Sequence, residues 1–180
     1  MDVPAPTAAA TYLLAFSNSK PAWTLPYSIG DNGPAGGKVF YLSDTSGFHG
    51  LEAAPIDQSG GIQWGCSGTL VGASGTAVGT GKANTAAINA VCGNGTAAQV
   101  AASYSLNGFT DWYLPSKDEL NLLFQQETIV GGFTRMYYWS SSEAFLGNSW
   151  FQYFDAQSLS GIQNSNPKGS AMAVRAIRSF

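Results

Sequence analysis

The stretch Leu114-Pro115-Ser116-Lys117-Asp118-Glu119-Leu120 carries the clearest structural signal of the 180-residue chain. Ser116 precedes Glu119 by three residues, which is the spacing of a capping box at the start of a helix. One apolar face at helical spacing follows, formed by Leu120, Leu123 and Phe124. The sequence therefore predicts a helix of about ten residues after Ser116, ending before Gly131-Gly132.

Working outward from this helix, strand patterns lie on both sides of a helical middle. Two more helices are predicted, capped by Asn84 and Thr96 and reaching Val91 and Tyr104. The expected strands are 38–42, 51–54, 62–64, 137–142, 150–154 and 171–180. An order of strands, helices and strands predicts an α+β domain with short strands, two to three helices and long loops.

The chain is long enough for one domain with a short tail. Residues 1–26 carry four prolines and are predicted to be a linker, and residues 27–180 the domain. The start has Asp2 and no basic segment, so it does not resemble a signal peptide. If the domain is cut from a longer chain, we expect the export signal in the missing part.

Composition narrows the classes of function. Charged residues make up 11% and aromatic residues 13% of the chain, and the formal net charge is −3. This balance argues against a protein that coats nucleic acid, and no apolar stretch has the roughly 20 residues needed to enter a membrane as a helix. A surface of Ser, Thr, Asn, Gln, Gly and aromatic residues is typical of binding surfaces.

The chain contains two cysteines, Cys66 and Cys92. A disulfide between them is favoured and implies an oxidising compartment. Two buried free thiols are the alternative. Zinc ligation together with His49 is disfavoured, because the spacing matches no familiar zinc pattern.

The sequence shows no catalytic constellation. His49 is the single histidine and lies in a turn-like stretch, so a hydrolase triad has no evident base. Nucleotide-binding glycine motifs are absent, and Gly81-Lys82-Ala83 lacks the hydroxyl that binds magnesium in a phosphate loop. A calcium site needs several oxygen ligands close together, and the sequence offers few of them at 31–32 or at Asp155 with Asn164. We therefore expect neither an enzyme, nor a cofactor, nor a metal site.

Several motifs in order resemble the C-terminal domain of the Legionella collagen-like adhesin family. The longest, residues 107–120, resembles that family's NG-x-x-DW-x-LPS-x-x-EL signature. Further matches are GPAGGKVF at 33–40, GLEAAP at 50–55, IQWGC at 62–66, YWSSSE at 138–143 and VRAIRSF at 174–180. Together they cover residues 27–180.

This resemblance implies a C-type lectin-like fold and a surface adhesin head that binds sulfated glycosaminoglycans or related polyanionic glycans. It also implies extracellular display on a collagen-like stalk, a homotrimer docked through residues 1–26, and roles in host cell attachment and biofilm. The calcium-dependent sugar motifs of C-type lectins are absent, so calcium-mediated sugar binding is not implied.

Resemblance to two other families leaves two alternative functions open. Variable domains of diversity-generating retroelements have similar folds and endings, and in them residues equivalent to 144–170 would bind a protein ligand. The formylglycine-generating fold is an enzymatic alternative, and it would need redox-active or copper-binding cysteines.

Cations and aromatic residues are the expected glycan-binding groups, because arginine and lysine suit sulfate and aromatic rings stack on sugars. The candidates are Lys117, Arg135, Lys168, Arg175, Arg178, Phe151 and Tyr153. Internal pairing with Glu143 or Asp118 is the alternative for the arginines of the closing strand. Alternation along residues 150–154 places Trp150 and Phe154 inward and Phe151 and Tyr153 outward, unless a following loop covers them.

Overall fold

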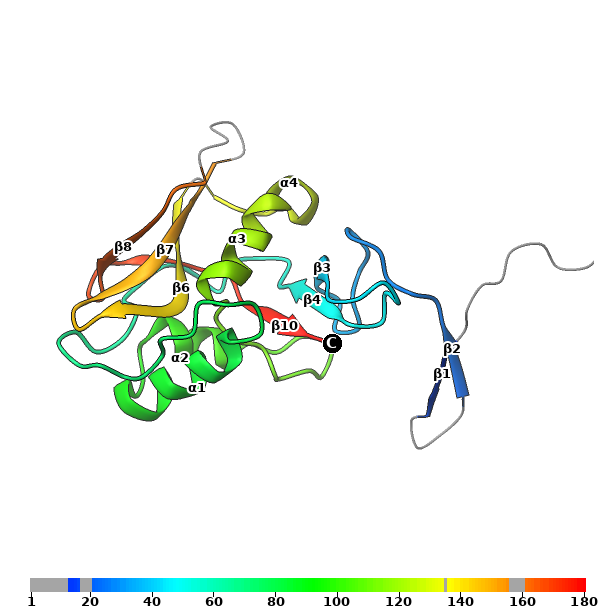
Figure 1. Cartoon of the computed structure of the whole chain (residues 1–180), viewed down its shortest axis with the longest axis horizontal. Coiled ribbons are helices and arrows are strands. Elements are labelled where there is room, and N and C mark those ends of the chain that lie inside the picture. The colour runs from blue at the N-terminus through cyan, green and yellow to red at the C-terminus, as the bar shows by residue number, and fades with distance from the viewer. Residues whose placement is uncertain (1–12, 17–20, 135, 156–160) are drawn as a thin grey trace, which may run out of the picture.

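A computed structural model describes residues 13–16, 21–134, 136–155 and 161–180 of the chain, and shows an α+β fold with long loops (Figure 1). The predicted fold class is therefore confirmed. In the first of these ranges, β1 (Leu13–Phe16) pairs antiparallel with β2 (Pro21–Thr24). This hairpin lies within the segment that the sequence predicted to be a linker.

Two further sheets build the domain. The smaller has the order β10-β4-β3 and the larger the order β5-β9-β6-β7-β8. The strands are β3 (Lys38–Leu42), β4 (Gly50–Ala53), β5 (Ser59–Ile62), β6 (Met136–Phe145), β7 (Asn148–Phe154), β8 (Gln163–Pro167), β9 (Met172–Val174) and β10 (Ile177–Ser179). All the pairs are antiparallel except β6 with β9.

The helices are α1 (Gly81–Cys92), α2 (Ala97–Ala102), α3 (Lys117–Gln125) and α4 (Glu127–Val130). At the start of α3 the Ser116 side chain accepts from the Glu119 backbone, and the Glu119 carboxylate accepts from the Ser116 N–H at 2.7 Å. The predicted capping box is confirmed. Thr96 likewise caps α2 through the N–H of Gln99.

Strand β6 separates two apolar clusters because consecutive residues point to opposite faces of a sheet. Trp139 packs on one side with Ile88 of α1 and with Trp64. Tyr138 packs on the other side with Leu120 of α3 and with Phe154. In Figure 1, α3 lies between the two sheets, and it contacts β3, β6 and β7.

Some predicted elements are wrong in detail. Asn84 does not cap α1, which begins earlier, at Gly81; its amide instead makes two hydrogen bonds with the backbone of Gly75. Strand β5 ends at Ile62, before Trp64. The predicted closing strand is split, since β9 belongs to the larger sheet and β10 to the smaller. Neither α4 nor β8 was predicted.

The disulfide between Cys66 and Cys92 is present and confirms the favoured pairing. It joins the end of α1 to the long segment between β5 and α1. The bond is compatible with an extracellular location.

Candidate recognition surface

Lys168, expected at the surface, is buried, with 0% of the residue exposed. Its ammonium lies 2.5 Å from Glu143 Oε1, donates to the Thr69 carbonyl at 2.7 Å and sits over the ring of Trp64. The prediction of a glycan-binding role for Lys168 is therefore wrong, because its charge is fully used inside the protein.

Arg175 is also internal, with 1% of the residue exposed. Its guanidinium binds Asp57 at 2.7 Å and donates to the carbonyls of Ala54, Gly131 and Gly132. Internal pairing had been the open alternative, with Glu143 or Asp118 as the expected partner. Arg175 holds loops together, and its predicted contact with a glycan is wrong.

Arg178 is 9% exposed and lies between two carboxylates. Its Nη1 lies 2.9 Å from Glu52 Oε1, and its Nε lies 2.5 Å from Asp111 Oδ1. Burial alone raises the pKa of Asp111, but the hydrogen bond and charge of Arg178 outweigh it and lower that pKa. Arg178 is thus neutralised within the domain rather than offered to sulfate, which corrects the prediction.

Lys117 is the predicted cation that keeps access to solvent within the described part of the chain. It is half-buried, and its ammonium lies 4.5 Å from the ring centroid of Trp150. Arg135, the remaining predicted cation, lies outside the described residues. The described structure therefore brings none of the predicted cations together into a basic ridge.

The two predicted aromatic residues do come together, with a third that was missed. Tyr137 is paired with Tyr153 across β6 and β7, and 51% of it is exposed. Its ring centroid lies 5.2 Å from that of Phe151 and 5.0 Å from that of Tyr153. We call Tyr137, Phe151 and Tyr153 the aromatic face. The two-residue alternation used for residues 150–154 could also have been applied to residues 137–142. It would have identified Tyr137 as a further residue of this face.

The aromatic face lies on the sheet side opposite to α3. The residues of β7 that alternate with it point toward α3, where Phe154 stacks edge-on against Phe124 and Gln152 bonds Asn121. Trp150 is on that side too but is only half-buried, unlike the core residue predicted, because Lys117 covers it instead of an apolar group. Lys117 and the aromatic face therefore belong to opposite sides of the sheet.

Two of the strands described at the aromatic face are uncharged. Strands β7 and β8 contain no acidic or basic residue. Asn164 is exposed beside Phe151, and Ile162 is 56% exposed beside Tyr153. Such a surface can stack on rings, pack against apolar groups and hydrogen-bond through amides, and its strands β7 and β8 offer no cation to a polyanion.

Three negative charges of the domain belong to buried glutamates that accept hydrogen bonds from backbone N–H groups. Glu52 accepts from the N–H groups of Ala35 and Gly37, and Glu143 from those of Val71 and Gly72. Glu119 accepts from Gly79 in the same way. Each carboxylate thus holds a glycine-rich loop to the core, a role that sequence reasoning did not foresee.

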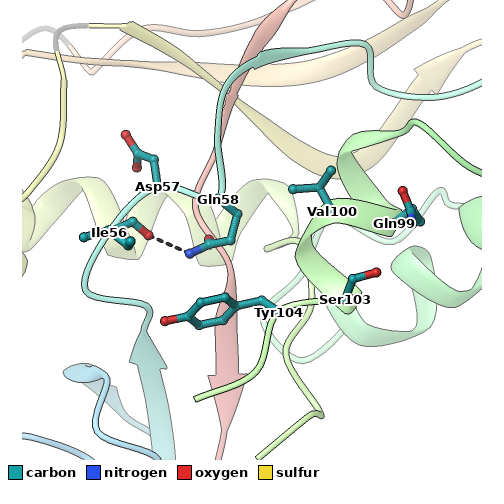
Figure 2. A pocket seen from close by; sticks show the side chains of 7 residues that line it. All are labelled: Ile56, Asp57, Gln58, Gln99, Val100, Ser103 and Tyr104. Atoms are coloured by element: carbon teal, nitrogen blue, oxygen red, sulfur yellow. Dashed lines mark hydrogen bonds between the residues drawn. The ribbon is translucent and has the colours of Figure 1, made fainter.

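The largest cavity described, about 400 Å³, lies between the 56–58 segment and α2 with the residues that follow it (Figure 2). It is lined by Ile56, Asp57, Gln58, Gln99, Val100, Ser103 and Tyr104. In Figure 2 the carboxylate of Asp57 points away from Tyr104, and it binds Arg175 and the Tyr138 hydroxyl.

The polar side chains that line this cavity either form hydrogen bonds within the protein or are uncharged at neutral pH. The Gln58 amide donates to the Ile56 carbonyl and accepts from Ala176. Burial raises the pKa of the Tyr104 phenol, so it stays protonated at neutral pH. The seven lining residues include no histidine, lysine or cysteine, and the carboxylate of Asp57 is engaged by Arg175 and Tyr138.

The same described ranges contain neither a cluster of metal ligands nor a membrane-spanning helix. There, no three His, Cys, Asp or Glu side chains gather as ligands for a metal ion. None of the helices placed by the structure is long and apolar enough to cross a bilayer.

Comparison with known proteins assigns neither a family nor a function to this surface. The chain matches no protein-family model, and no curated protein matches it significantly.

Proposed function

We propose that this chain is a non-catalytic extracellular recognition head that binds a protein ligand through the aromatic face. The carrying observation is the cluster of Tyr137, Phe151 and Tyr153, of which the last two lie on a strand without charged side chains. Tyrosine beside Ser and Asn is the composition of antibody binding loops. The family resemblance supports a displayed adhesin, and the retroelement relatives support a protein ligand for residues 144–170.

The charge distribution favours a protein ligand over a sulfated glycan. Binding a polyanion requires accessible cations, whereas Lys168, Arg175 and Arg178 are consumed by internal partners. Aromatic anchors on a neutral surface provide much of the binding energy of protein interfaces. The homotrimer belongs to the same proposal, because repetition of a modest site would raise its avidity.

Binding to cultured cells tests this function. The purified domain is labelled and applied to cells treated with protease, with heparinase and chondroitinase, or left untreated. We expect protease treatment of the cells to abolish binding of the domain. Treatment with heparinase and chondroitinase should leave that binding unchanged. Replacing Tyr137 and Tyr153 by Ser should weaken binding about tenfold or more, since Tyr137 is an exposed aromatic anchor and Tyr153 is half-buried against it.

A matched control is Leu70→Ser, because Leu70 is 63% exposed and its neighbour Val71 binds Glu143, six positions along β6 from Tyr137. This variant should bind like the parent domain. Equal loss in Leu70→Ser, or full binding by the tyrosine variant, would contradict the proposal. Light scattering on the same samples measures the oligomeric state.

Sulfated glycosaminoglycans remain a second candidate ligand because Lys117 lies half-exposed over Trp150. A cation on an aromatic ring can contact a sulfate and a sugar ring together. Heparin chromatography separates the two candidates. Retention that Lys117→Gln abolishes and the tyrosine variant leaves intact would support this glycan ligand.

A further inference from the structure

A second cavity, of about 230 Å³, lies between α1 and the segment 110–113. One face of α1 lines it, at the helical spacing i, i+3, i+4 and i+7. The lining residues are Lys82, Thr85, Ala86, Asn89, Ala102, Thr110, Asp111, Trp112 and Tyr113. Small side chains from α1 and from the end of α2 leave this space unfilled.

Two buried polar atoms of this lining have no hydrogen-bond partner. Over the described residues, three buried side-chain polar atoms are unpaired, namely Asn89 Oδ1, Trp112 Nε1 and Ser149 Oγ. Two of the three belong to residues of this one cavity. One is an acceptor and the other a donor, and leaving either unpaired is unfavourable.

The charges at the cavity are balanced. Lys82 is exposed, while Asp111 shares its carboxylate with Arg178. The two charges lie close enough for Lys82 to help lower the pKa of Asp111. Since both signs are present, the cavity has no strong preference for an anion or a cation.

We propose that this cavity binds one residue of a neutral sugar. A hydroxyl group both donates and accepts, so two neighbouring hydroxyls satisfy both orphaned atoms: one accepts from Trp112 Nε1 and the other donates to Asn89 Oδ1. The space suits a single ring rather than a longer chain. This site is separate from the aromatic face and does not depend on the proposed protein ligand.

Both orphaned atoms are covered in the structure, so the proposed binding requires an adjustment of the side chains that cover them. The hydrogen bonds gained by two previously unpaired atoms offset that adjustment. Binding is therefore expected to change the environment of the Trp112 indole N–H directly.

Nuclear magnetic resonance can follow that indole N–H. Glucose, galactose, mannose and N-acetylglucosamine are titrated separately into the labelled full chain, with sodium sulfate as an anion control. The Trp112 signal is identified by its loss in Trp112→Phe. We expect at least one sugar to shift this signal saturably and sulfate to leave it unmoved.

A matched pair of variants tests the location. Ala86→Leu adds a branched apolar side chain to the lining and should weaken sugar binding about tenfold or more, equivalent to about 1.4 kcal/mol. Ala83→Leu makes the same change on an exposed part of α1 outside the lining and should bind normally. Thermal denaturation checks that both variants are folded.

A second pair tests the polar contacts. Asn89→Ala should weaken binding, whereas Ser149→Ala removes the third unpaired atom, away from the cavity, and should not. The proposal is overturned if no sugar moves the Trp112 signal, if only sulfate moves it, or if Ala86→Leu binds sugar as well as the parent chain.

Discussion

The ammonium of Lys168 lies 2.5 Å from the carboxylate of Glu143, and both side chains are almost completely buried. The pair also holds a loop. Glu143 accepts from the N–H groups of Val71 and Gly72, and Lys168 donates to the carbonyl of Thr69. One ion pair therefore joins the 69–72 segment to β6 and to the end of β8.

Lys168→Met is expected to lower the free energy of unfolding by about 3–5 kcal/mol, because it leaves the Glu143 charge buried without its partner. Urea denaturation monitored by tryptophan fluorescence measures this. Lys82→Met, at an exposed position, should change stability by less than about 0.5 kcal/mol.

Replacing both Lys168 and Glu143 by Met should not restore stability. The double variant removes both charges but also leaves the N–H groups of Val71 and Gly72 without their acceptor. A double variant as stable as the parent would show that the pair does not hold the loop.

Glu119→Gln should flatten the dependence of stability on pH. Burial raises the pKa of Glu119 above its ordinary 4.5, despite the hydrogen bonds it accepts. The folded state thus holds this proton more tightly, so the free energy of unfolding falls as pH rises from 4.5 through the raised pKa. Urea midpoints measured from pH 4 to 8 test this for both proteins.

Asp111→Asn provides a comparison of opposite sign. The folded pKa of Asp111 is lowered, so its stabilisation is present above its ordinary pKa of 3.8 and is lost as pH falls through the folded value. The variant should be less stable than the parent at neutral pH, and the difference should shrink in acid. If both variants shift the profile in the same direction, this account of the two carboxyls fails.

Tyr138→Phe should reduce sensitivity to alkali. Burial raises the pKa of the Tyr138 phenol from 10.0 to about 12, and its hydrogen bond to Asp57 adds to the rise. Stability contributed by this phenol is lost as pH increases from 10 toward 12. Thermal denaturation from pH 8 to 11 should show a smaller decrease for the variant.

At neutral pH the same variant should be less stable by about 1 kcal/mol, because the Tyr138 hydroxyl donates to Asp57 at 2.8 Å. Tyr137→Phe, on the aromatic face, should change stability by less than about 0.5 kcal/mol. A larger effect at Tyr137 than at Tyr138 would contradict the burial described.

Replacing Cys66 and Cys92 by Ser should lower the free energy of unfolding by about 3–4 kcal/mol through loss of the cross-link over 26 residues. Hydrogen exchange should show the largest loss of protection between Cys66 and α1. Mass spectrometry of the parent chain after alkylation without reductant should find neither cysteine labelled. Labelling at Cys92 in the native chain would argue against the bond.

Sequence reasoning succeeded where the interacting groups lie within a few residues. The capping box of Ser116 and Glu119 and the cap at Thr96 were found because donor and acceptor are three residues apart. The Asn107-Gly108 pair follows a local rule of the same kind, since both residues adopt positive φ, as a tight hairpin turn requires. The disulfide was favoured because the chain contains a single pair of cysteines.

Sequence reasoning failed where the partner is remote. Lys168 follows a proline near a turn and therefore resembled a surface residue, yet its carboxylate partner lies 25 positions earlier. Glu52 and Arg178 are 126 positions apart. No local sequence pattern predicts that two such side chains form an ion pair, because their contact depends on how the two sheets and α3 are assembled.

The same contacts clarify what the family motifs encode. Glu52, Glu119, Glu143, Arg175 and Arg178 all belong to segments that carry the resemblance, and each holds a loop or a strand inside the domain. These motifs therefore predict architecture. The aromatic face lies on other residues, whereas the proposed sugar cavity takes Thr110, Asp111, Trp112 and Tyr113 from the 107–120 signature.

Pairing of β10 with β4 has a consequence for how the protein is made. Residues Ile177–Ser179 form the edge of the smaller sheet, next to a strand made about 125 residues earlier. The sheet cannot close during translation until this last strand emerges. Until then, one edge of β4 lacks its pairing strand, and a chain in which residues 177–179 are removed is expected to be cleaved by protease faster than the parent.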